Sequence, residues 1–236
     1  MRDKTLGNQT QEQHALITDF VQSTAYSEAL RTFYANVRFR WEKSASRPAR
    51  AHSLLIATPV AYGDYTAVAA NLAIVAAQSG TDTILVDADL RSPGYAQRFG
   101  VEKTSGLSDL LLDESLTPEK IDAALQSTFV PGLRLLGAGG GVARSQAATL
   151  LFSPRLEKVA QSLYQRPDTT ENENALVIFH SPPVLAGADA ALIGAQVEQT
   201  ALAIIAGHTT RVQAKQAQEQ LQQARAHLVG VVMLNL

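Results

Sequence analysis

The sequence predicts an α/β protein whose sheet is mostly parallel and doubly wound, with helices on both faces. Two observations predict this fold class. Short apolar runs rich in β-branched residues alternate with longer segments whose apolar residues recur at helical spacing. Several helical segments open on a capping residue, as expected for helices that cross between parallel strands. The expected strands cover residues 54–57, 83–87, 133–136, 175–179, 200–206 and 228–234.

Composition limits the possible functions. The 236 residues, 46% of them hydrophobic, are enough for one α/β domain with a well-buried core. The net charge of −2 gives no broad basic surface, so no nucleic-acid partner is expected. The lack of cysteine excludes disulfides and thiolate metal sites. No apolar run reaches the roughly 18 residues of a membrane helix and no signal-peptide core opens the chain, which is typical of a cytoplasmic protein.

The chain divides into a polar, glutamine-rich segment over residues 1–26, expected to be mobile, and a single domain over 27–236. Within the domain, a helix over 27–43 precedes a core over 52–236, and a short Ser/Ala/Arg/Pro linker joins them. Ser27 is a favourable N-cap for this helix. Its apolar stripe, typical of a helix docked on a larger body, consists of Leu30, Phe33, Val37 and Trp41.

The core opens with a strand–loop–helix–strand unit over residues 54–91. An alanine-rich helical segment that ends at Gly80 lies between the first two apolar runs. The loop before it lies where such units bind phosphate. A phosphate site requires glycines, so that backbone N–H groups approach the anion, and a lysine for its charge. This loop instead contains Tyr62, Gly63, Asp64, Tyr65 and Thr66.

Later elements follow from capping residues and turn composition. The glycine run 137–141 is interpreted as a structural loop rather than a second phosphate site. Capped helices are expected over residues 118–126, 153–165 and 210–226, beginning at the capping residues Thr117, Ser153 and Thr210.

Three motifs carry a family resemblance. The run from Thr58 to Ala73, T-P-V-A-Y-G-D-Y-T-A-V-A-A-N-L-A, is similar to S-P-x-P-G-E-G-K-S-T-x-A-A-N-L-A. V-D-A-D-L-R-S-P at 86–93 matches the next motif in full, and G-L-S-D-L at 106–110 also matches. From about residue 27 to 235 the chain thus resembles the cytoplasmic kinase domain of the bacterial tyrosine kinases. These are P-loop proteins of the MinD/ParA-like class that work with membrane polysaccharide co-polymerases, so a P-loop NTPase-like fold is implied.

The resemblance places substitutions at the nucleotide site. Tyr65 stands at the family's P-loop lysine, Asp64 and Tyr62 stand at glycines, and Thr66 keeps the hydroxyl that would bind Mg²⁺. The implied nucleotide-binding positions, degenerate in this chain, are Gly63, Asp64, Tyr65, Thr66, Ala67 and, where the family reads adenine, Asn235.

Any bound Mg²⁺ would be held by Thr66, Asp87 and Asp89. In the run H-S-P-P-V-L, His180 replaces the family's Walker B carboxylate, while Asp189 matches the next family aspartate. A lone histidine at a strand end is usually a hydrogen-bonded polar residue. The other histidines do not lie at metal-ligand spacing, so no new metal site is expected.

The N-terminal helix resembles the segment that joins the family's subunits into a ring. The family's E-x-x-R-x-x-R-T-N becomes Glu28, Arg31, Tyr34, Ala35 and Asn36, so one arginine is lost. The resemblance implies that Glu28, Arg31 and Tyr34 contact a neighbouring copy or an intact relative. The alternative is a surface helix that only docks on its own core.

Two functions are consistent with these residues. The first is a non-catalytic, degenerate kinase-like domain, without a cofactor, that regulates exopolysaccharide or capsule biosynthesis or export. It would contact a membrane co-polymerase, an intact kinase relative or its own copies at the inner face of the membrane. The alternative is a tyrosine kinase or ATPase that binds Mg-ATP or Mg-ADP through unusual ligands. Tyr65, His180 and the lack of a tyrosine-rich tail favour the first, although a shortened chain would also explain the missing tail. A partition-type, DNA-linked ATPase fits the motifs less well.

Overall fold

The computed structural model describes residues 16, 25–42, 51–102, 105–140, 142, 144–165 and 175–234. They form a 7-stranded sheet in the order β3-β4-β2-β5-β1-β6-β7, with β3 antiparallel to β4 and the other pairs parallel. The mostly parallel α/β fold is therefore confirmed. The strands are β1 (His52–Ala57), β2 (Asp82–Asp87), β3 (Leu125–Ser127), β4 (Leu133–Leu136), β5 (Ala175–His180), β6 (Gln199–Ile205) and β7 (Leu228–Leu234).

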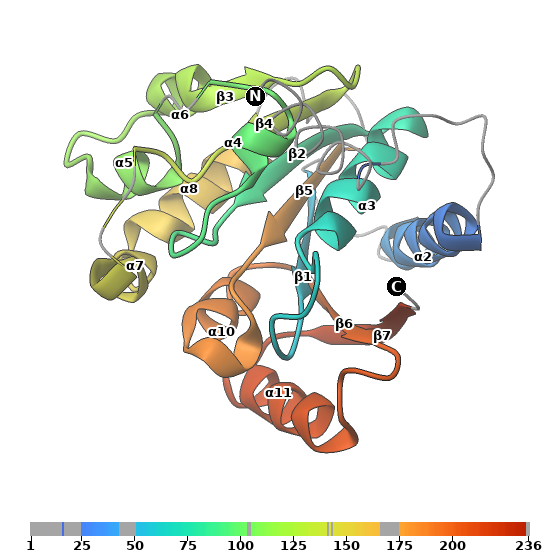
Figure 1. Ribbon diagram of the computed structural model, residues 1–236. Helices are drawn as coiled ribbons and strands as arrows, with labels where there is room; N and C mark the ends of the chain where they lie inside the picture. The colour runs from blue at the N-terminus through green and yellow to red at the C-terminus, as the bar shows by residue number, and fades with distance from the viewer. Residues whose placement is uncertain are drawn as a thin grey trace, which may run out of the picture.

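Helices cover both faces of the sheet (Figure 1). Side chains alternate along β1, so Leu54 and Ile56 pack beneath one helical layer and Leu55 and Ala57 beneath the other. The first layer contains α2 (Ala25–Glu42), α3 (Ala67–Gln78) and α4 (Tyr95–Arg98). The second contains α5 (Leu107–Leu112), α6 (Pro118–Ala124), α7 (Arg144–Leu151), α8 (Arg155–Tyr164), α10 (Asp189–Gly194) and α11 (Arg211–Gln223). A 3-10 turn, η1 (Val184–Ala186), follows β5.

Helix α3 fixes the position of the loop that precedes it. Every residue from Ala67 to Ala77 is buried, and the many alanines let the helix backbone lie close to the sheet. In Figure 1, α2 lies beside α3 on this face. Because β1 leads directly into the loop 58–66 and α3 is held by packing, the loop stays at the carboxyl end of the sheet.

Some predicted element ends are confirmed and others are wrong. Thr117 and Thr210 each accept a hydrogen bond from the backbone N–H three residues on, as the capping pattern predicts. Ser27 is not an N-cap: α2 begins at Ala25, and Ser27 is buried in its first turn. The helix predicted over 118–126 is shorter, because the chain leaves α6 at Ala124 and enters β3, a strand too short to carry a periodic signal.

Several predictions fall on residues outside the described ones: the linker before Ala51, Asn235, and most of the segment 1–26. Leu16, which is described, is 6% exposed and belongs to the core cluster that contains residues of α2 and α3, and mobility of the segment stays a prediction. Among the described residues, no helix has both the length and the hydrophobicity that crossing a bilayer requires.

Candidate functional site

The carboxyl ends of three neighbouring parallel strands bring the predicted site residues together. β5 lies between β1 and β2, and its last residue, His180, pairs in register with Asp87 at the end of β2. The loop 58–66 follows β1 at the same edge. Thr66 and Asp89 therefore join His180 and Asp87 where open α/β sheets place their ligands.

Asp64 is the charged centre of the loop. Its Oδ1 accepts hydrogen bonds from the Thr66 hydroxyl at 2.6 Å and from Nη2 of Arg98 at 2.7 Å. Burial alone raises the pKa of Asp64, but the hydrogen bonds from Arg98 and Thr66 outweigh it and hold that pKa below its usual value. Nη2 of Arg98 also donates to Thr66 Oγ1 at 2.9 Å. The hydroxyl that would bind Mg²⁺ is thus already engaged.

Tyr65, at the position of the family lysine, directs its hydroxyl to a carboxylate. It donates to Asp89 Oδ2 at 3.2 Å. Burial, together with the charge of Asp89, raises the pKa of Tyr65, so the phenol stays protonated and carries no charge. Asp89 Oδ1 accepts the backbone N–H groups of Arg91 and Ser92 at 3.1 and 2.9 Å. Tyr65 therefore contributes a neutral hydrogen-bond donor to this loop.

Asp87 is 1% exposed at the end of β2. Its Oδ2 accepts the backbone N–H groups of Gly94 and Tyr95, both at 3.2 Å, and its Oδ1 accepts that of Asp89 at 3.3 Å. Burial raises the pKa of Asp87 to about 7, although these hydrogen bonds act against the shift. This carboxyl group is therefore partly protonated near neutral pH.

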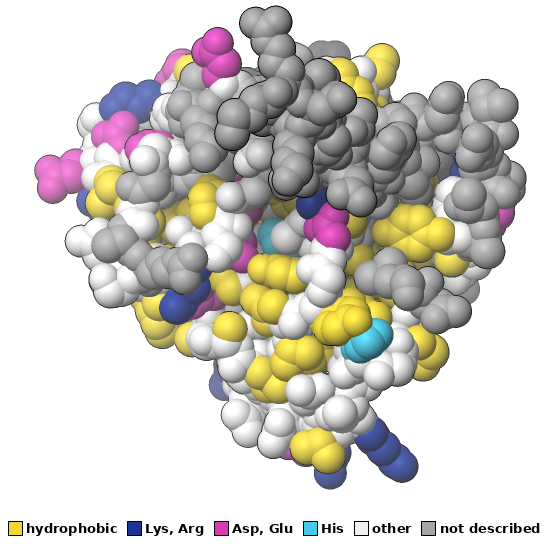
Figure 2. Space-filling view, in the orientation of Figure 1, with side chains coloured by type: hydrophobic (Ala, Val, Ile, Leu, Met, Phe, Trp, Pro, Cys, Tyr) yellow, Lys and Arg dark blue, Asp and Glu magenta, His cyan; other side chains and the backbone are white. Residues whose placement is uncertain are grey.

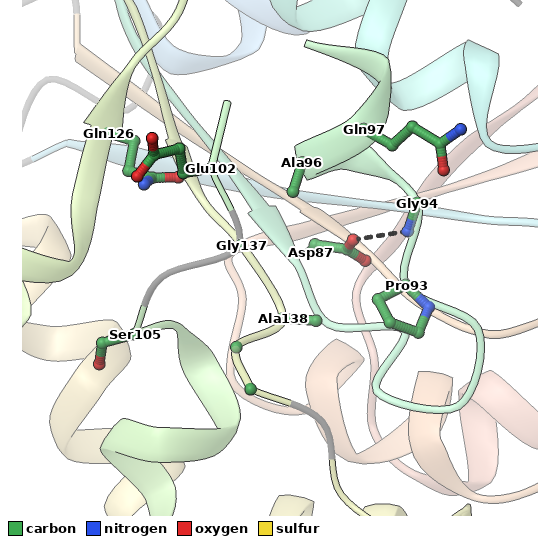
Figure 3. A pocket seen from close by; sticks show the side chains of 12 residues that line it. Asp87, Pro93, Gly94, Ala96, Gln97, Glu102, Ser105, Gln126, Gly137 and Ala138 are labelled. Atoms are coloured by element: carbon green, nitrogen blue, oxygen red, sulfur yellow. Dashed lines mark hydrogen bonds between the residues drawn. The ribbon is translucent and has the colours of Figure 1, made fainter. Parts of the chain in front are cut away.

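A cavity of about 120 Å³ borders Asp87, and the glycine loop 137–140 forms one of its walls. Figure 3 shows the Glu102 and Gln126 side chains lining this cavity on one side of the view and the hydrogen bond from Gly94 to Asp87 on the other.

One glycine of this loop is required by the local structure. Gly139 has φ 101°, and a Cβ there would collide with the carboxylate of Asp109. Oδ2 of Asp109 accepts the N–H of Gly106 at 2.9 Å and that of Gly140 at 3.0 Å. These contacts support the structural interpretation of the glycine run.

His180 is 3% exposed and lies close to two aromatic rings. Its ring centroid is 5.7 Å from that of Tyr65 and 5.1 Å from that of Tyr95. Burial, reinforced by the nearby charge of Arg98, lowers the pKa of His180 to about 3, so the imidazole is neutral at pH 7. Within the described part of the chain its Nε2 has no hydrogen-bond partner, so the expected hydrogen bonding is not found at this nitrogen.

Among the described residues, no three His, Cys, Asp or Glu side chains are grouped to share an ion. Asp189, the other matched aspartate, is used structurally. It accepts Nε of Arg91 at 2.6 Å and Nη2 at 2.9 Å, a two-bond ion pair that ties the segment after β2 to α10.

The N-terminal helix presents only part of its expected contact residues. Glu28 and Arg31 form an ion pair within α2 at 2.6 Å, and their side chains are 52% and 32% exposed. The expectation that Tyr34 contacts a neighbouring copy is wrong. Tyr34 is 5% exposed and its hydroxyl hydrogen-bonds to Thr81, so its side chain is not available to another subunit. Helical spacing places Tyr34 on the side of α2 that docks on the core.

Two features of the site were missed from the sequence. Arg98 belongs to no motif and to no periodic pattern. The one signal in the sequence was the charge of Asp64, which needs a partner where it is buried. Tyr62 stacks on His208 with ring centroids 3.6 Å apart and planes 19° apart, while remaining 43% exposed. Figure 2 shows hydrophobic side chains gathered across the middle and lower part of this face, with histidine among them.

Comparison with known proteins agrees with the motifs. The chain is 33% identical over 207 residues to the tyrosine-protein kinase YwqD of Bacillus subtilis, a match that covers 88% of this chain and 80% of YwqD. The chain belongs to the bacterial tyrosine-protein kinase family. The chain is also 30% identical over 205 residues to the putative tyrosine-protein kinase EpsB of Ralstonia solanacearum. That match covers 87% of the chain but 25% of EpsB. No family model matches the chain.

Solved structures give the same assignment of fold. The BceF tyrosine kinase domain superposes with a TM-score of 0.75 at 26% identity, over 98% of this chain and 88% of that domain. The cell division ATPase MinD of Pyrococcus furiosus has a TM-score of 0.59 at 20% identity over 76% of this chain and 70% of MinD, a likeness of fold alone. The P-loop NTPase-like architecture is therefore confirmed for this tyrosine-kinase family member.

Proposed function

We propose that this chain is a non-catalytic member of its family that regulates exopolysaccharide or capsule biosynthesis or export through protein contacts. The observation that carries the proposal is the Tyr65 hydroxyl bonded to Asp89, at the position of the family's lysine. A neutral phenol tied to a carboxylate brings no charge to a phosphate group, and phosphoryl transfer depends on positioning and charge neutralisation.

The neighbouring residues fit Mg-nucleotide poorly, which supports the proposal. Loss of a lysine contact costs about 1.5–3 kcal/mol, because that contact is charge-assisted. A carboxylate such as Asp64, roughly 5 Å from a phosphate charge, costs about 3 kcal/mol at an effective dielectric near 20. The sum, on the order of 5 kcal/mol, is a loss of about three to four decades in affinity.

The proposed partners are a membrane polysaccharide co-polymerase, an intact kinase relative or further copies of the chain, met at the inner face of the membrane. The part-exposed pair of Glu28 and Arg31 on α2 supports a contact surface there.

Isothermal titration of the chain with Mg-ATP and Mg-ADP tests the proposal, with the BceF tyrosine kinase domain titrated for comparison. We expect no measurable binding at micromolar nucleotide. Micromolar binding by the unmodified chain, together with ATP turnover that Asp87→Ala abolishes, would contradict a non-catalytic role.

One observation favours a second function, an ATP-binding tyrosine kinase or ATPase with Mg²⁺ at Thr66, Asp87 and Asp89. Arg98 brings a guanidinium group from α4 to the loop, where it could contact phosphate in place of the lysine. If this is its role, the unmodified chain binds Mg-ATP and Arg98→Gln loses that binding.

A further inference from the structure

Two segments far apart in the sequence are tied together at the site by side-chain bonds. One is the loop 58–66, and the other is the stretch 87–98 that runs from the end of β2 through α4. The first tie is the ion pair between Asp64 and Arg98 at 2.7 Å, and the second is the bond from Tyr65 to Asp89 at 3.2 Å. In the third, the Tyr95 hydroxyl donates to the carbonyl oxygen of Thr66 at 2.7 Å.

The ion pair is shielded from water on one side. The Arg98 side chain is 14% exposed and that of Asp64 is 38% exposed. Removing one partner of a partly buried pair leaves the other charge without compensation, which is unfavourable. The pair is therefore expected to hold the two segments more firmly than an exposed ion pair does.

The ties occupy groups that an anion or metal bound at this loop would use. The Asp64 carboxylate takes the Thr66 hydroxyl and the Arg98 guanidinium, and Tyr65 takes an oxygen of Asp89. In nucleotide switches, contacts from a bound phosphate and its Mg²⁺ order such segments, which are released when the phosphate leaves. Here the ordering contacts come from the chain itself.

We propose that Asp64, Tyr65 and Arg98 form an internal latch that holds the loop 58–66 against the stretch 87–98 without any ligand. The latch keeps this edge of the sheet in one conformation regardless of nucleotide concentration. Arg98 acts in it as a positioning residue. The inference goes beyond the proposed function, since it concerns the conformation of the site and not catalysis or the identity of a partner.

Hydrogen–deuterium exchange of the whole chain, read by mass spectrometry without nucleotide, tests the latch. Arg98→Gln should speed amide exchange about tenfold in both segments, including the loop that it does not belong to. Asp64→Asn, which keeps the side-chain shape, should do the same in the stretch 87–98. Because both changes remove the same ion pair, the double variant should exchange no faster than the more affected single variant.

Two further variants keep the test decisive. Tyr65→Phe removes one hydroxyl and keeps the ring, so it should fold and speed exchange of the Arg91 and Ser92 amides, which bond to Asp89. Lys215→Gln, which breaks an exposed pair with Glu219 on α11, should leave both segments unchanged. Acceleration confined to the mutated segment in Arg98→Gln and Asp64→Asn would overturn the latch.

A nucleotide arm separates this inference from the proposed function. Millimolar Mg-ATP should leave exchange in both segments of the unmodified chain unchanged, and slower exchange there would show that the ties depend on a ligand. The coupling between segments is measured without nucleotide, so it can fail while the chain still does not bind ATP. Conversely, ATP turnover in solution would contradict the proposed function and leave the measured coupling intact.

Discussion

At the scale of single residues, charge balance limits what the loop can bind. Tyr65 contributes one neutral hydrogen bond to Asp89, and the negative charge of Asp64 is matched by Arg98. The loop is therefore neutralised by side chains of the chain itself, whereas a phosphate site needs uncompensated positive charge. Two substitutions are enough to change that balance.

Asp64→Gly combined with Tyr65→Lys should restore affinity for Mg-ATP. The change removes a carboxylate, releases Arg98 and adds an ammonium group, while Thr66 and Asp87 stay in place. The expected gain, measured by isothermal titration, is about a thousandfold, within the ~5 kcal/mol assigned to these two positions. ATP turnover should additionally need His180→Asp, which supplies the missing carboxylate.

A control for this variant changes net charge equally and lies away from the loop. Glu219→Gln with Gln223→Lys adds the same charge on α11. Equal gains in affinity from both double variants would show that the effect is general electrostatics and not repair of the loop.

His180→Asn should make the free energy of unfolding rise in mild acid, where that of the unmodified chain changes little. In the unfolded chain His180 takes up a proton near pH 6.5, whereas in the folded chain its pKa is about 3. Its contribution to stability is therefore present above pH 6.5 and is lost as the pH falls toward 3. Between pH 7 and pH 5 the loss is about 2 kcal/mol.

Asp87 acts in the opposite direction over the same range. Its folded pKa of about 7 lies above its unfolded value of 3.8, so its cost to stability is relieved as the pH falls from 7 to 4. Urea unfolding at pH 7 and pH 5 should show His180→Asn gaining stability in acid, Asp87→Asn losing it, and the unmodified chain changing little. Parallel responses in the two variants would contradict both assignments.

At the scale of elements, local signals predicted what local physics decides. The β1–α3–β2 unit carried its own apolar runs, its alanines and the Gly80 stop. The docked stripe of α2 was also visible from the sequence, since Leu30, Val37 and Trp41 are all buried. The prediction of Ser27 as an N-cap is wrong because a capping preference does not fix where a helix begins when tertiary packing extends that helix.

Trp41→Ala should weaken the docking of α2. Trp41 is 8% exposed and stacks on His52 with ring centroids 4.5 Å apart and planes 2° apart. Truncation of a buried tryptophan costs about 3 kcal/mol of unfolding free energy, so the urea midpoint should fall clearly.

Phe39→Ala on the same helix is the matched control, because Phe39 is 59% exposed and its loss should cost less than about 0.5 kcal/mol. A larger effect from Phe39→Ala would mean that the other side of α2 is the docked one.

At the scale of the whole molecule, the sequence predicted which strand ends meet but not which side chains bond across them. Asp64 and Arg98 are 34 positions apart, and Arg91 and Asp189 are 98 apart. Pairs between separate loops have no periodicity, and they depend on the tertiary placement of every element between them. The lowered pKa of His180 could not be predicted from the sequence either, because the burial of His180 comes from both neighbouring strands and from rings on two other segments.

Assembly is the remaining question at this scale, and Arg31→Ala addresses it. With Tyr34 turned inward, the hypothesis of a contact between subunits depends on Glu28 and Arg31, which now satisfy each other within α2. A neighbouring subunit could exchange that local pair for one across the interface without disturbing the core. Light scattering of the chain alone and mixed with an intact kinase domain should therefore give a lower assembly mass for Arg31→Ala.

Lys120→Ala is the matched control for this measurement. Lys120 also forms a local ion pair, with Asp113 at 2.6 Å, but belongs to the helical layer on the other face of the sheet. An unchanged mass for Arg31→Ala in both samples, or an equal loss for Lys120→Ala, would leave α2 as a helix that docks only on its own core.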